Sequence, residues 1–449
     1  MQVPQSLNKI YPSKMMLGKK EPVFKGEVNQ EWFAFRGVEA DCVQKAHAAD
    51  LAFVLRRQES TKRVGWTLFS KNLTTRHLEM SAIGYMPLIL NPAHELDTLV
   101  TVLERSISVA DRLGENYVVL TADQALYCKL IELRWFDERY QDRIILKMGG
   151  LHIALNFQKA IGQQMQASGL SEVWTESGVV GEGAASLILN GKSYAKAMRV
   201  HKLTYKALWQ LLLPAFLAFV ENKDPELAKM VSEECKNPEI LIDLLTKHHV
   251  TSLLREFSRK ESEKDVNFSF WWQYLEMIST LLLFTRSLRD GLWEPYLEAI
   301  VQMLPYFMRY DHLNYAKSVP VFIADMMTLP EEVHSKFLQG DFVVKRSNDK
   351  FNQVDADYAQ EWIVGTGKES GGVVGITNEI SAVQRWALSF HWRSEVATKT
   401  YTMFDLDVRT ATHNELNSGR PKRDEKDENS LVSTLKRLTS LQQSLMQQF

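Results

Sequence analysis

A chain of 449 residues with 45% hydrophobic residues is too long for one ordinary core, so the composition predicts a globular protein of two or three subdomains. A formal net charge of −2 excludes a protein that coats nucleic acid through bulk positive charge, so any such binding must be local. The cysteines, Cys42, Cys128 and Cys235, lack metal-ligand spacing, which excludes a disulfide framework and indicates a reducing, intracellular compartment.

Strands and helices are predicted to alternate in residues 76–191, after a weakly periodic N-terminal segment at residues 1–75. Apolar runs typical of strands are Ile83–Leu90, Tyr117–Thr121 and Arg143–Met148. Helical spacing falls in His94–Gly114, Asp123–Phe136 and Gly149–Met165. This alternation predicts an α/β core, a parallel or mixed sheet with helices packed on it.

Residues 192–340 change character, because helical spacing runs through them without a strand signal. We therefore expect a large all-α insertion. Its apolar run Ala207–Val220 is too short to cross a bilayer, so it predicts a buried helix and no membrane partner. Strand character returns at Asp341–Arg346, and residues 341–408 are expected to rejoin the sheet.

The polar end of the chain, residues 409–449, is expected to be a flexible tail with a short amphipathic helix at its terminus. Mixed charge and few apolar residues predict that residues 409–430 are mobile. An apolar stripe follows and offers a homodimer contact through residues 431–449. The stripe consists of Leu431, Leu435, Leu438 and Leu445.

Basic residues recur at three- and four-residue steps near the start of the predicted insertion. On a helix these charges fall along one face, the geometry needed to track a nucleic-acid backbone. A solvated helix face explains the same spacing without any ligand, and both interpretations stay open. The residues are Lys192, Lys196, Arg199, Lys202 and Lys206.

Three chemically capable residues lie where the predicted sheet would place a site. Asp123 comes just after the strand Tyr117–Thr121, and His152 comes shortly after Arg143–Met148. Glu361 lies in a predicted helix beyond the returning strand, and we expect it to face inward. The carboxyl ends of strands are where open sheets hold their chemistry. Each residue alone has an ordinary explanation: Asp123 as a helix cap, His152 as a turn histidine and Glu361 as a surface glutamate. Only their order along the chain predicts a site.

Long segments of the chain resemble a large family of uncharacterised, multi-copy animal proteins derived from transposons. The resemblance runs from Val64 to Arg423. It is carried by "VVLTADQALYCK", "KMGGLHIALNFQKAIG", "GKSYAKAMRVHKL" and "GDFVVKRSNDKFNQVDADYAQEW" among other segments. The order of strand, acid, strand, histidine, helical insertion and acid is similar to that of cut-and-paste transposases. The resemblance therefore implies a ribonuclease-H-like core.

In such transposases, carboxylates hold two Mg²⁺ or Mn²⁺ ions that clamp the attacking and leaving oxygens of a phosphodiester. Asp123 would match the second acid, His152 the histidine of the next strand, and Glu361 the last acid, with Asp123 and Glu361 as metal ligands. Residues 1–75 show no strand ending in Asp, so the first acid either lies upstream of this chain or is missing. We expect a sheet that lacks its opening strands and no DNA cleavage.

The segment "RYDHLNYAK" supplies Asp311 and His312 as weaker site candidates. Adjacent Asp and His cannot share one ligand site on a helix face, so a helix junction with buried hydrogen bonds explains the segment as well. Three functions follow: a transposon-derived protein with a degenerate phosphoryl-transfer core that contacts DNA, a non-catalytic binding protein, and a helical scaffold that dimerises through its C-terminus. The expected location is intracellular, and nuclear if DNA is the partner.

Overall fold

The computed structural model describes residues 9–15, 29–33, 41–59, 64–84, 86, 89, 91–368, 413–417 and 419–438, with isolated positions between 377 and 403. Its strands are β1 (Val118–Ala122) and β2 (Ile144–Met148). Its helices before residue 192 are η2 (Gln30–Phe33), α1 (Asp41–Glu59), α2 (Trp66–Leu73), α3 (Leu96–Leu113), α4 (Gln124–Phe136), α5 (Glu138–Gln141), α6 (Gly150–Gln164), α7 (Leu170–Glu176) and α8 (Glu182–Leu189). The later helices are α9 (Tyr194–Lys223), α10 (Pro225–Glu234), α11 (Pro238–Lys247), α12 (Val250–Lys264), α13 (Val266–Asp290), α14 (Trp293–Arg309), α15 (Leu313–Met327), α16 (Glu331–Gln339), α17 (Ala356–Lys368), α19 (His413–Leu416) and α20 (Arg420–Leu438).

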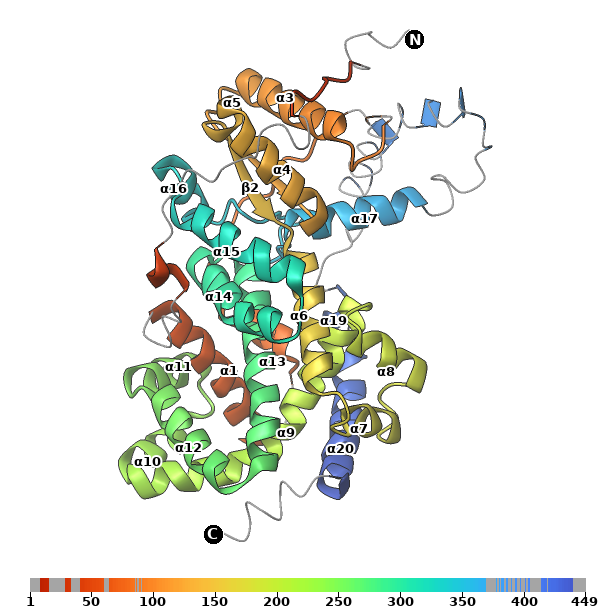
Figure 1. Cartoon of the computed structure of the whole chain (residues 1–449). Coiled ribbons are helices and arrows are strands. Elements are labelled where there is room, and N and C mark those ends of the chain that lie inside the picture. Colours follow the sequence, from red (N-terminus) through yellow and green to blue (C-terminus); the bar gives the residue numbers. More distant parts are fainter. Residues whose placement is uncertain are drawn as a thin grey trace.

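The sheet is one parallel pair of strands at one end of the molecule, beside α3, α4 and α5 (Figure 1). Val118 pairs with Ile144 and Ala122 with Met148, so both strands end at the same edge. Every residue of β2 is buried. Parallel strands joined through α4 are the arrangement that the apolar, β-branched runs and the helical spacing between them predict.

The predicted ribonuclease-H-like mixed sheet is wrong. The part of the chain that the structure describes contains the two-stranded sheet and otherwise mainly helices. The described positions of the predicted strand at residues 83–90 are not in a strand. Asp341–Arg346 forms one isolated antiparallel bridge, between Val344 and Val354. The reason is packing: Phe342 lies against the rings of Trp293 and Tyr296 of α14 instead of extending the sheet.

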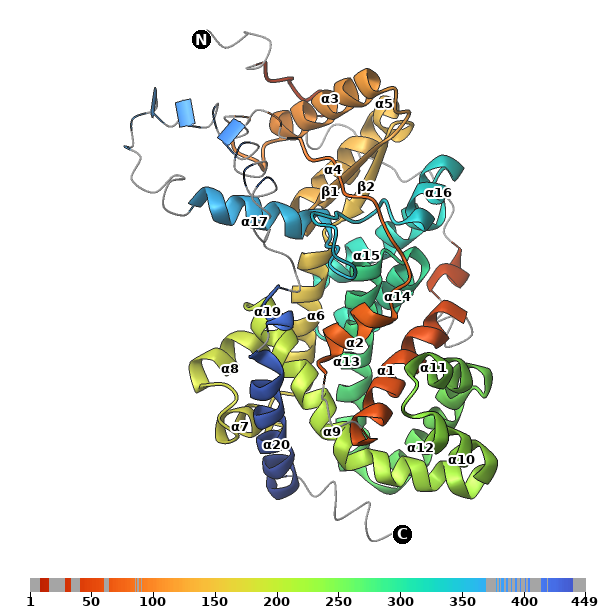
Figure 2. The ribbon, with the colours of Figure 1, turned by 180° about the vertical axis from the view of Figure 1, so that it is seen from behind.

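Helices fill most of residues 194–339, as their spacing predicts, and α6 runs from the sheet into this helical part (Figure 1, Figure 2). One hydrophobic core joins the sheet, these helices, α1 from the N-terminal segment and α20 from the tail. The helix α9 is long and apolar enough to cross a membrane by length and composition, but 67% of its apolar window is buried inside the fold. This is the buried helix expected from the run Ala207–Val220.

The part of the expected flexible tail that the structure describes is largely helical, and its mobility stays a prediction. Residues 413–416 and 420–438 are helical, and α20 packs against α9 and α7 (Figure 2). Leu431 and Leu435 are fully buried inside the chain, while Leu438 is exposed. Two leucines of the proposed dimer stripe therefore serve the chain's own core, and Leu445 lies outside the described residues.

Candidate functional site

The carboxyl edge of the sheet gathers the residues that sequence order singles out. The backbone N–H of Gly149 donates to the carbonyl of Ala122, 2.8 Å away, which joins the segment after β2 to the end of β1. Asp123 follows β1 directly, and His152 lies in the first turn of α6. The helix α17, which carries Glu361, packs against α6 and the end of β1. The fold thus brings Asp123, His152 and Glu361 to one place although the large sheet is absent.

Asp357, which sequence analysis did not single out, is the residue that contacts His152. Its Oδ2 accepts a hydrogen bond from His152 Nδ1 at 3.0 Å. The backbone N–H groups of Leu151 and His152 donate to the same carboxylate at 3.1 and 3.2 Å. Asp357 therefore caps the N-terminus of α6 from a distant part of the chain, where the helix dipole favours a negative charge.

Two glycines make this approach possible. A side chain at Gly149 would collide with the Asp357 carboxylate, and one at Gly150 would collide with Asp355. Asp355 is buried in an ion pair with Lys147 of β2. Burial raises the pKa of the Asp355 carboxyl, and Lys147 opposes this rise. The two glycines before Leu151 thus allow two carboxylates to pack closely against the backbone. The glycine pair is visible in the sequence, but the sequence does not show that Asp355 and Asp357 are the residues that approach it.

The environment of His152 favours its charged form. The hydrogen bond to Asp357 raises the pKa of His152 above its usual value of 6.5, although burial opposes the rise. The charges of Asp123 and Glu361 raise the pKa of His152 further. Because a carboxylate can only accept, Nδ1 carries the proton, so in the neutral ring Nε2 is the acceptor. A histidine side chain with 32% exposure and a fixed tautomer can transfer a proton at Nε2.

The acids around His152 have different tasks. Asp123 Oδ1 accepts the backbone N–H of Leu126 at 2.9 Å and is the N-cap of α4, the ordinary role considered for it from sequence. Glu361 is exposed, so the expectation that it faces inward is wrong. It lies one helical turn beyond Asp357, a spacing that places both on one face of α17. That spacing was the signal that could have identified Asp357.

A metal centre would need more than these residues provide. Within the described ranges, no group of three or more His, Cys, Asp and Glu side chains is arranged to hold a metal ion. The Mg²⁺ or Mn²⁺ site implied by the resemblance to transposases therefore stays a prediction without a complete ligand set.

The basic stripe on α9 is not one open face. Lys192 and Lys196 are exposed, but Lys202 and Lys206 are buried, so the continuous exposed stripe is wrong. Burial lowers the pKa of Lys202 to about 8, which leaves its ammonium charged at neutral pH. Lys206 places its ammonium 5.1 Å from the centre of the Phe53 ring.

Acidic residues of the tail cover the same stripe. Arg199 contacts Asp424 at 2.8 Å and also Asp427, both of α20. Glu415 of α19 accepts hydrogen bonds from Lys202 at 3.2 Å and from Arg289 at 2.9 Å. Burial alone would raise the pKa of Glu415, but these two cations outweigh it and lower that pKa strongly.

Asp311 and His312 form a helix junction. Asp311 is exposed, and His312 is buried at the N-terminus of α15. His312 Nε2 lies 2.6 Å from Gln163 Oε1, and burial lowers the pKa of its imidazole. Hydrogen bonding explains this pair, which lies apart from the contacts that surround His152.

No curated protein and no solved structure matches the chain. A family profile described as a domain of unknown function, DUF8702, matches residues 65–447 and so includes the sheet and the helices from α2 to α20. The chain therefore belongs to the DUF8702 family.

Proposed function

We propose that this is a transposon-derived protein whose phosphoryl-transfer centre is incomplete, and that it contacts nucleic acid without cutting it. The observation that carries the proposal is the use of the carboxylates at the sheet edge. Asp123 caps α4, and Asp357 caps α6 and holds His152. Mg²⁺ needs several anionic oxygens to offset its dehydration, and oxygens engaged as helix caps serve it poorly.

Charge around His152 supports the same conclusion. Asp123, Asp357 and Glu361 surround one imidazole with negative charge. The buried cation beside them, Lys147, is bound to Asp355. A phosphodiester would be repelled here unless cations bridged it to the acids, and phosphoryl transfer needs such charge in its transition state. These charges support a site that can move a proton at His152 but disfavours a phosphodiester.

Contact with nucleic acid is proposed for the exposed start of α9. Lys192, two residues before α9, and Lys196, in its first turn, are exposed, whereas Arg199 and Lys202 are paired with acids of the tail. Each phosphate contact adds about 0.9 to the slope of log affinity against log salt. Two lysines predict weak binding with a shallow salt dependence.

The cleavage arm of the proposal is tested with purified protein, supercoiled or hairpin DNA, and Mg²⁺ or Mn²⁺. We expect no metal-dependent nicking. Nicking that disappears in both Asp123→Asn and Glu361→Gln would show an intact centre and overturn the proposal.

The binding arm uses a fluorescein-labelled DNA duplex and anisotropy between about 50 and 200 mM salt. We expect the Lys192→Ala/Lys196→Ala double variant to lower the salt slope by about 2. The matched control is Lys229→Ala/Lys236→Ala, which removes the same charge from exposed positions on and after α10. Equal slopes for the two double variants would place the contact elsewhere and refute this arm.

A further inference from the structure

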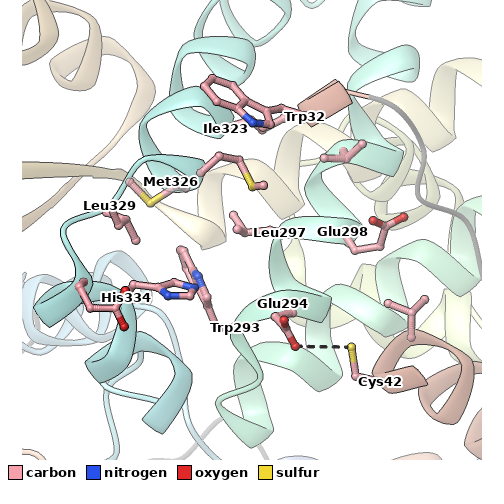
Figure 3. A pocket seen from close by; sticks show the side chains of 14 residues that line it. Trp32, Cys42, Trp293, Glu294, Leu297, Glu298, Ile323, Met326, Leu329 and His334 are labelled. Carbon is pink, nitrogen blue, oxygen red and sulfur yellow. Dashed lines mark hydrogen bonds between the residues drawn. The ribbon is translucent and has the colours of Figure 1, made fainter. Parts of the chain in front are cut away.

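A second place in the fold has the form of a ligand site, and it lies away from the sheet edge. A cavity of about 470 Å³ lies between η2, the start of α1, α14, α15 and α16. Figure 3 shows Trp32 and Ile323 on one side of it, Trp293 and His334 on another, and Leu297 and Met326 between them. This volume falls within the range of pockets that hold small molecules.

The walls of the cavity are apolar and rigid. Val43, Ile323 and Met326 are almost fully buried, and so is Trp293. The Trp293 ring is held by edge contacts with Phe337 and Phe342, at centroid distances of 4.6 and 5.0 Å. Rings and aliphatic chains held by packing form a preformed surface, so a ligand loses little free energy in ordering them.

Three of the polar groups at the cavity are carboxylates, and the other two are the Cys42 thiol and the His334 imidazole. Glu294 and Glu298 lie four residues apart on α14, and Glu331 opens α16. None of the 14 lining residues is Lys or Arg. Glu294 has as its hydrogen-bond partner the thiol of Cys42, with Sγ and Oε2 4.0 Å apart, and no cation among the described residues pairs with it (Figure 3).

Two indole rings line the cavity. Trp293 is 2% exposed, and Trp32, on the other side of the cavity, is half-buried. The faces of Trp32 and Trp293 also attract cations through their ring quadrupoles.

We propose that this cavity binds a small organic cation, an ammonium group carried on an apolar body. The ammonium pairs with Glu294 at the open side of the cavity, and the apolar body lies between Trp32, Trp293 and Met326. Anionic ligands are excluded by the three glutamates, and neutral apolar ligands gain only the contact with the walls. Cys42 lies beside Glu294, and burial raises the pKa of its thiol, so it reacts slowly with alkylating reagents and can report whether the cavity is occupied.

The test uses the full chain and three probes of one shape: 3-phenylpropylammonium, 3-phenylpropanol and 3-phenylpropionate. Isothermal titration should show the ammonium binding about tenfold more tightly than the alcohol, and no binding of the carboxylate. Glu294→Gln should remove this preference, and Trp32→Ala should weaken both binding probes. Glu226→Gln, an exposed change of equal charge on α10, is the control and should leave binding unchanged.

Alkylation provides the second measurement. The ammonium probe should slow iodoacetamide modification of Cys42, read by peptide mass spectrometry, and leave the rate at Cys128 unchanged. Equal affinity for ammonium and alcohol would reduce the site to an apolar cavity and overturn the proposal. A preference for the ammonium over the alcohol that survives in Glu294→Gln, or ammonium binding that fails to protect Cys42, would place the cation elsewhere. No binding of any probe would reject the site.

Discussion

Docking of α20 onto α9 and α7 is the feature of this fold that a single leucine can test. Leu435 is fully buried, whereas Leu438, three residues later on the same helix, is 41% exposed. Truncating a buried leucine to alanine costs about 2–5 kcal/mol, from lost transfer free energy and from the cavity left behind. A central value of about 3 kcal/mol corresponds to a factor of about 100 in the docking equilibrium.

We therefore expect Leu435→Ala to raise the rate of amide exchange in residues 420–438 about 100-fold relative to the unaltered chain. Leu438→Ala changes the same type of residue at an exposed position, and we expect an effect within about 0.5 kcal/mol. Hydrogen exchange followed by mass spectrometry resolves both effects on one peptide. The reasoning fails if the two variants exchange alike, or if α20 is already unprotected in the unaltered chain.

Three further predictions concern the charged sites. The pKa of His152 should lie above 6.5 in the folded chain. A raised pKa adds stability that is fully present below pH 6.5 and is lost as the pH rises through the pKa of the folded state. The difference in free energy of unfolding in urea between the unaltered chain and His152→Gln should therefore shrink between pH 6 and pH 8.5. An imidazole NMR titration at or below 6.5 would contradict this. Gly149→Ala should displace Asp357 and lower the pKa of His152, whereas Gly84→Ala, where a methyl group meets open space, should leave that pKa unchanged. Glu415→Gln should destabilise the fold by about 3 kcal/mol in urea unfolding, because it leaves Lys202 and Arg289 buried without their carboxylate; a loss below about 0.5 kcal/mol would contradict the buried network.

Local rules explain what could be predicted of the sheet and its edge. The apolar runs of β1 and β2 and the helical spacing of α4 define a parallel pair, and parallel strands end at one edge. Asp123 and His152 therefore meet there whether the sheet has two strands or more. Glu361 lies near them because α17 packs against α6. The outward direction of Glu361 and the contact of Asp357 with His152 depend on how α17 packs, which the spacing of residues in the sequence does not determine.

The number of strands in the sheet could not be predicted from such local rules. An apolar segment such as Asp341–Arg346 can extend a sheet or pack on a helix, and its composition is the same in both cases. Here Phe342 packs against the rings of Trp293 and Tyr296, and the segment forms one β-bridge, through Val344. The order of strand, acid, strand, histidine and acid along the chain is equally compatible with a two-stranded sheet, so order alone could not establish the larger one.

The basic stripe and the charged tail show why segments interpreted singly mislead. Alone, the cations from Lys192 to Lys206 indicate a nucleic-acid face, and the carboxylates between residues 409 and 430 indicate disorder. Together, Arg199 meets Asp424 and Asp427, and Lys202 meets Glu415, so each segment neutralises the other. A charged segment can be interpreted only when the segment that it contacts is known. Here the two segments are more than 200 residues apart in the sequence, so they must be compared with each other before either is assigned to solvent or to a ligand. Any nucleic acid that binds α9 must therefore do so through the positions that the tail leaves exposed, Lys192 and Lys196, or displace α20 at the free-energy cost of Leu431 and Leu435.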